Sequence, residues 1–121
     1  MKPLGYAAVQ QQTVSGRDLE RTLLERVTAK MRSSIDNNTD IARLHESLRL
    51  NRNIWTTFAA DLASPDNMYP DDVKASLISI ASYIERNTFA AAKQTSVLKS
   101  FVDINTAIIQ GLEASRDVET D

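Results

Sequence analysis

The side chains that most often do chemistry are scarce in this chain of 121 residues, which has one histidine, His45, and no cysteine. A zinc site or a nucleophilic relay needs several such side chains held together. His45 and Glu46 are adjacent, so on a helix they point in different directions and do not share one metal ion. The glycines, at positions 5, 16 and 111, form no phosphate-binding loop. We therefore expect no enzymatic activity, no metal site and no cofactor.

Three asparagines stand at positions that a helix would bury. Asn51 interrupts an apolar row whose members are alternately three and four residues apart, which keeps them on one helix face: Ile41, Leu44, Leu48, Asn51, Trp55, Phe58 and Leu62. Asn87 and Asn105 interrupt two similar rows. We expect each amide to bond to a backbone carbonyl or to another asparagine and so fix the helix register, with direct ligand contact as the alternative. Trp55 and Phe58 are expected in the core rather than at a cofactor.

These rows predict an all-α fold, a small four-helix bundle. The expected helices run from about residue 15 to 34, from 39 to 62 with Thr39 as N-cap, from 70 to beyond 87, and from 95 or 96 to 112. Only a weak break at 93–96 separates the last two, so a near-continuous helix is the alternative. Residues 1–14 are expected to form an arm, flexible or docked through Tyr6 and Val9, residues 15–112 the helical domain, and residues 113–121 a polar tail.

Composition narrows the choice of partners. The net charge is −2 and the isoelectric point is near 5.4, whereas proteins that bind phosphate backbones usually carry a basic excess, so direct nucleic-acid binding is not expected. No apolar run reaches the roughly 18 residues of a membrane span, and no secretory signal is present, so we expect a cytoplasmic protein without a membrane partner. Five basic side chains are interpreted as solvated surface: Lys30, Arg32, Arg43, Arg49 and Arg52.

The fourth expected helix has two apolar rows where an ordinary surface helix needs one. The first contains Val97, Phe101, Ile104 and Ile108, and the second contains Leu98, Val102, Asn105, Ile109 and Leu112. Either the helix leaves a groove open for a partner, or it is central and covered on both sides, or it forms a homodimer. Both a monomer and a homodimer are therefore compatible with the sequence.

Taken together, several segments resemble the FlaF family of small flagellar proteins of α-proteobacteria, over about residues 6–112. They are Arg17 to Glu20, Asn51-Arg-Asn-Ile-Trp55, Asp61-Leu62, the loop Pro65 to Pro70, Ile80 to Arg86, and Ile104-Asn105 to Gly111-Leu112. The motif residues carried over are Asn51, Trp55, Phe58, Asp61, Asn67, Pro70, Asn105 and Gly111. Tyr69 stands where the family usually has leucine, and the segment 89–99 lacks the glycine-bearing turn of many relatives.

The resemblance implies a non-enzymatic cytoplasmic factor that is needed for flagellin synthesis and export and binds flagellin as a secretion chaperone. The partner-binding residues expected in that role are Val97, Phe101, Ile104, Ile108 and Leu112. Ile108→Asp or Phe101→Asp is then expected to abolish binding. The alternative is a regulatory adaptor that controls flagellin translation through the regulator FlbT without stable flagellin binding. Direct binding of flagellin mRNA is a third, weaker hypothesis.

Overall fold

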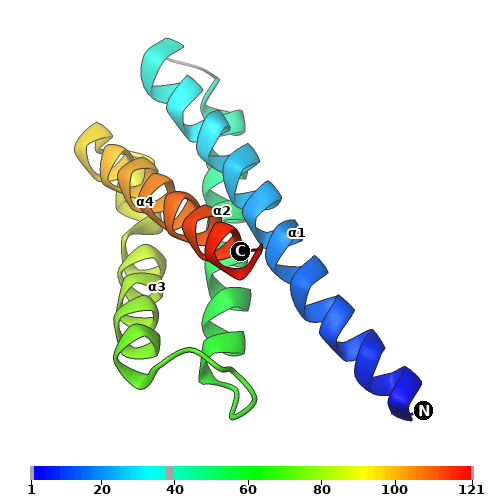
Figure 1. The fold of residues 1–121 in the computed structure, drawn as a ribbon. Coiled ribbons are helices and arrows are strands. Elements are labelled where there is room, and N and C mark those ends of the chain that lie inside the picture. Colours follow the sequence, from blue (N-terminus) through cyan, green and yellow to red (C-terminus); the bar gives the residue numbers. More distant parts are fainter. Residues whose placement is uncertain (1, 38–39, 121) are drawn as a thin grey trace.

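The computed structural model describes the backbone of residues 2–37 and 40–120 and the side chains of residues 20–37 and 40–111. It contains four α-helices (Figure 1): α1 (Lys2–Asn37), α2 (Ile41–Ala63), α3 (Asp71–Ala91) and α4 (Thr95–Thr120). The predicted all-α four-helix bundle is confirmed. Within the part of the chain that the structure describes, no helix is both long and apolar enough to cross a membrane.

The helices pack in a cyclic order in which each contacts the next, and α4 closes the ring against α1. In Figure 1, α2 and α3 run side by side in opposite directions, while α1 and α4 cross them obliquely. Among the described residues, the backbones of α2 and α4 do not approach each other, so this diagonal pair is joined through side chains. Contacts between α2 and α4 are therefore made by side chains that meet in the core.

The core is built largely from the apolar rows that the sequence shows. Its buried members come from all four helices: Met31, Leu48, Trp55, Phe58, Leu62, Ala81, Ile84, Ala91, Leu98, Phe101 and Val102. The row of α2 is buried from Leu48 to Leu62, but its first member, Ile41, is 64% exposed. Ile41 is the first residue of its helix and lies beyond the part of α2 that the other helices cover.

Two expected helix ends are wrong. Helix α1 begins at Lys2 rather than near Ser15, so residues 2–14 are helical; alanine and glutamine favour helix, and Pro3 falls in the first turn, where its missing N–H costs nothing. Helix α4 continues to Thr120 instead of ending near Gly111. The suggested docking through Tyr6 and Val9 lies outside the described side chains.

The break between the third and fourth helices is real. Ala92 is the C-cap of α3, and α4 begins at Thr95. The two are therefore separate helices rather than one near-continuous helix. The turn at residues 92–94 directs α4 back across the bundle, which buries Phe101 and Val102, and the burial of these side chains favours the break.

Helix α2 begins with a side-chain cap. The N-cap is Asp40 rather than the predicted Thr39, which lies outside the described residues, and the Asp40 carboxylate accepts a hydrogen bond from the Ala42 N–H at 3.1 Å. Asp40→Ala is expected to lower the free energy of unfolding by about 1 kcal/mol, since it removes this bond and a negative charge at the positive end of the helix dipole.

Urea unfolding followed by circular dichroism measures this change. Asp36→Ala is the matched control because it removes the same charge from an exposed site in the last turn of α1, at the negative end of a dipole. It is expected to leave stability unchanged or raise it slightly. Equal losses in both variants would show that net charge, and not the cap, is responsible.

Candidate functional site

A chain of polar side chains crosses the core between α2 and α4. The Trp55 Nε1–H donates to Asn105 Oδ1 at 2.9 Å, and Asn105 Nδ2 donates to Asn51 Oδ1 at 2.8 Å. All three side chains are at most 1% exposed. The expectation that Asn51 and Asn105 bond to another asparagine is confirmed, and Trp55 is a core residue as predicted. Asn87 takes the other predicted form, since its amide donates to the Tyr83 carbonyl within α3 at 2.8 Å.

This polar chain ends in an unpaired donor. Asn51 Nδ2 is buried and has no hydrogen-bond partner among the described residues. A buried donor without a partner costs about 1–3 kcal/mol. The three polar side chains thus join the diagonal helices α2 and α4 at a definite register. The unpaired donor offsets part of the stabilisation that their hydrogen bonds provide.

The loop between α2 and α3 is organised by three of the motif residues. Asn67 Nδ2 donates to the Asp61 carboxylate at 3.2 Å, and Asn67 Oδ1 accepts from the Tyr69 N–H at 3.0 Å. Pro70 then serves as N-cap of α3. An asparagine that bonds to the backbone two residues later is a common way of shaping such a turn. The loop places Tyr69 against the core at the start of α3.

An apolar groove lies next to this loop, where α2 ends, α3 begins and α4 passes. We call it the apolar groove; it has a volume of about 190 Å³ and is lined by Phe58, Tyr69, Val73, Leu77, Ala107, Ile108 and Gly111. None of the lining side chains carries a charge, and Val73 is 36% exposed. The groove contains two motif residues, Phe58 and Gly111, and one predicted partner-binding residue, Ile108.

The remaining predicted partner-binding residues are mostly covered. Phe101 is 0% exposed and meets the Tyr83 ring edge-on at 6.0 Å between ring centroids. Phe101 is therefore not part of an open binding surface, contrary to the prediction. Phe101→Asp would bury a carboxylate and unfold the protein, so a loss of binding in this variant would result from unfolding. Val97 and Ile104 are half-buried and packed against the core, and the Leu112 side chain lies outside the described residues.

The two apolar rows of α4 are therefore covered in the first half of the helix and partly open in the second half. In the first half of the helix both rows are covered, because α1 and α3 pack on either side of it. Beyond Asn105 the cover opens, and Ala107 and Gly111 are exposed. Tyr69, Val73 and Leu77 also line the groove, but they come from other elements, so no spacing within α4 indicates them.

The sequence pattern of the family described as Flagellar protein FlaF matches residues 4–112. This chain belongs to the FlaF family. Searches of curated proteins and of solved structures found no significant match. FlaF-family membership makes this a flagellar protein.

The motif residues by which the chain resembles FlaF serve two purposes in the structure. Asn51, Trp55 and Asn105 form the buried polar chain, while Asp61, Asn67 and Pro70 shape the loop. Gly111 has neither purpose: its backbone is not in the left-handed region, and a Cβ built on it meets nothing within 4 Å. A helical glycine costs about 1 kcal/mol relative to alanine. Neither the fold nor the backbone explains this FlaF glycine.

Among the described side chains, no group of three or more His, Cys, Asp or Glu residues is placed to hold a metal ion. His45 is exposed on α2. The five basic side chains predicted to lie at the surface of this FlaF-family chain are all exposed, and Arg32 also donates to the Thr106 hydroxyl on α4 at 3.1 Å.

Proposed function

We propose that this protein is a cytoplasmic secretion chaperone that binds flagellin and holds it for export. Membership of a flagellar family supports the flagellar context. The observation that carries the proposal is the apolar groove, an uncharged recess at the surface where three helices meet. A chaperone of this kind needs such a recess to shield apolar side chains of its client from water.

The groove suits an amphipathic helix. Flagellin, the partner that the family resemblance implies, has long amphipathic terminal helices. A helix of this kind docks by placing apolar side chains at spacings of three and four residues into a hydrophobic groove. Ile108, Tyr69 and Val73 line the recess from α4, the loop and α3. In the bound state we place one terminal helix of flagellin along this recess.

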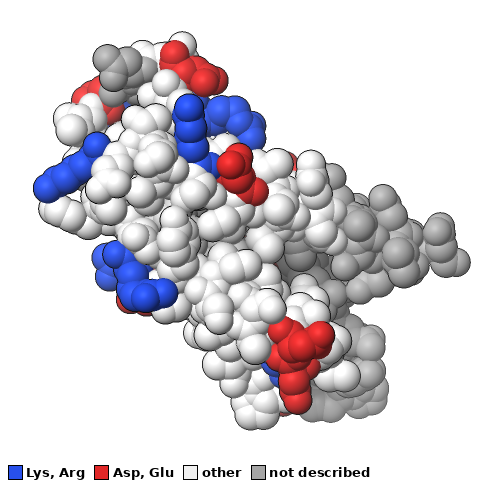
Figure 2. Space-filling model, turned by 90° about the vertical axis from the view of Figure 1, so that its left-hand side faces the viewer, with Lys and Arg blue, Asp and Glu red and all other residues white. Residues whose placement is uncertain are grey.

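Part of the surface next to the groove is also free of charge. Two stretches of the chain contain no charged residue, 75–84 in α3 and 104–112 in α4. The exposed residues of α3 in the first stretch are small or apolar: Ala75, Ser76, Ile78, Ser79 and Ser82. Figure 2 shows the side of the molecule on which α3 and the first half of α4 lie, and uncharged side chains cover most of it. A helix laid along these two stretches buries no unpaired charge, a burial that would weaken binding.

Gly111 supports the same placement. The space beside it is open, and the residue lines the groove. A position without a side chain lets a second helix approach α4 closely. The contact with a partner gives a reason for the glycine that the free protein does not provide.

Titration calorimetry of the full chain with flagellin from the same source tests the proposal. We expect a saturable 1:1 complex with a dissociation constant in the micromolar range or tighter, about −8 kcal/mol or more favourable. Flagellin that lacks its C-terminal helix is expected to bind at least tenfold more weakly. No heat with either form would contradict the proposal and favour the regulatory adaptor that acts through FlbT.

A further inference from the structure

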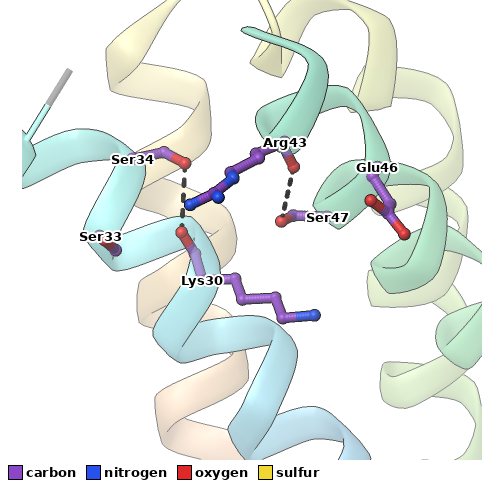
Figure 3. A pocket seen from close by; sticks show the side chains of 6 residues that line it. All are labelled: Lys30, Ser33, Ser34, Arg43, Glu46 and Ser47. Atoms are coloured by element: carbon purple, nitrogen blue, oxygen red, sulfur yellow. Dashed lines mark hydrogen bonds between the residues drawn. The ribbon is translucent and has the colours of Figure 1, made fainter. Parts of the chain in front are cut away.

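A second recess lies between the last turns of α1 and the first two turns of α2. We call it the polar cleft; it has a volume of about 310 Å³ and is lined by Lys30, Ser33, Ser34, Arg43, Glu46 and Ser47. Figure 3 shows Arg43 extending from α2 toward Ser34 on α1, with Lys30 one turn below. The cleft therefore has a cation on each wall, contributed by two helices that the tertiary structure brings together.

Two of the three serine hydroxyls of the cleft donate to carbonyls of their own helices. Ser34 Oγ donates to the Lys30 carbonyl at 3.1 Å, and Ser47 Oγ donates to the Arg43 carbonyl at 2.9 Å. A hydroxyl has one proton, so these two oxygens are left as acceptors. The charged donors on the cleft walls are the ammonium of Lys30 and the guanidinium of Arg43. Neither cation lies within ion-pair distance of a carboxylate among the described side chains.

The segment of the chain that contains the cleft residues also carries a net positive charge. Residues 26–52 contain six of the fourteen Lys and Arg residues but three of the sixteen acids, which gives this part a net charge of +3 against −5 for the rest. A locally positive recess raises the local concentration of anions and speeds their association. The polar cleft thus lies in the basic part of an acidic protein.

We propose that the polar cleft binds an acidic segment of a protein partner. Lys30 and Arg43 hold its carboxylates, and the guanidinium offers two parallel donors to one of them. Glu46 and the serine oxygens accept from N–H groups of the same segment. A protein segment provides both carboxylates and N–H donors. A nucleic-acid strand fits less well, because Glu46 repels phosphate and the cleft has no aromatic side chain on which a base stacks.

The cleft is separate from the apolar groove. Ser47 lines the cleft and Phe58 lines the groove, so along α2 the two are about 16 Å apart. One partner segment in the groove therefore leaves the cleft free. The inference does not depend on the proposed function, and either can fail without the other.

Titration of the ¹⁵N-labelled full chain with acetylated hexaglutamate amide tests the inference. At about 10 mM ionic strength, where screening is weak, we expect saturable shifts of the backbone amide signals of Ser33, Ser34, Arg43 and Ser47. Lys30→Met and Arg43→Met are each expected to weaken binding at least fivefold. Glu46→Gln is expected to tighten it, because the substitution removes a like charge.

Lys99→Met is the matched control, since it removes the same charge from an exposed position on α4. It is expected to change the affinity by less than twofold. A loss as large as that of Lys30→Met, or shifts that grow without saturation, would overturn the proposal in favour of general charge attraction. Tighter binding of a uridylate 12-mer than of hexaglutamate at the same amides would overturn it in favour of RNA.

Discussion

Asn105→Leu is expected to lower the free energy of unfolding by about 3–5 kcal/mol, close to the upper end for single substitutions. The amide of Asn105 accepts from Trp55 Nε1 and donates to Asn51 Oδ1 inside the core. Leucine removes both bonds and leaves two buried polar atoms without partners, each at a cost of about 1–3 kcal/mol. Urea unfolding followed by circular dichroism measures the loss, and Trp55 fluorescence reports the core around it.

Asn51→Leu is the matched control for this prediction. Both asparagines are 0% exposed and interrupt an apolar row in the same way. Removal of Asn51 leaves one partner unsatisfied, Asn105 Nδ2, and also removes the unpaired Asn51 Nδ2. We therefore expect a smaller loss, about 1–2 kcal/mol. A loss at Asn51 equal to or larger than that at Asn105 would contradict this assignment of the polar chain.

Gly111→Phe is expected to weaken flagellin binding at least 30-fold while the protein stays folded. The added side chain starts in open space, so the fold tolerates it, but it occupies the apolar groove and excludes a partner helix. Calorimetric titration with full-length flagellin measures the affinity. Circular dichroism is expected to show helicity and stability at least equal to those of the original protein, since phenylalanine favours helix more than glycine does.

Gln110→Phe provides the matched control. Gln110 is the exposed neighbour of Gly111 on α4 and does not line the groove. The same bulk placed there is expected to change flagellin affinity by less than threefold. If Gly111→Phe binds flagellin as well as the original chain does, the apolar groove is not the binding site, whether or not flagellin binds elsewhere.

Apolar spacing in the sequence predicts some helix boundaries and not others. Apolar spacing predicts α2 and α3 well, because each helix buries residues of its row against the core. The expected ends of α1 and α4 differ from the structure, because each helix continues beyond its apolar row through alanine, glutamine and glutamate. Burial and helicity are separate properties, and only burial leaves a periodic pattern.

The sequence by itself determined the fold class, the core rows and the family, and it predicted that the asparagines bond to a backbone carbonyl or to one another. These follow from local rules, since an apolar face must be covered and a buried amide must find a partner. Only the tertiary structure decided that Phe101 is covered, that residues of α2, α3 and α4 leave an apolar groove, and that Lys30 and Arg43 line one polar cleft. Whether a side chain is covered depends on which helix lies against it, and residues far apart in the chain set that packing.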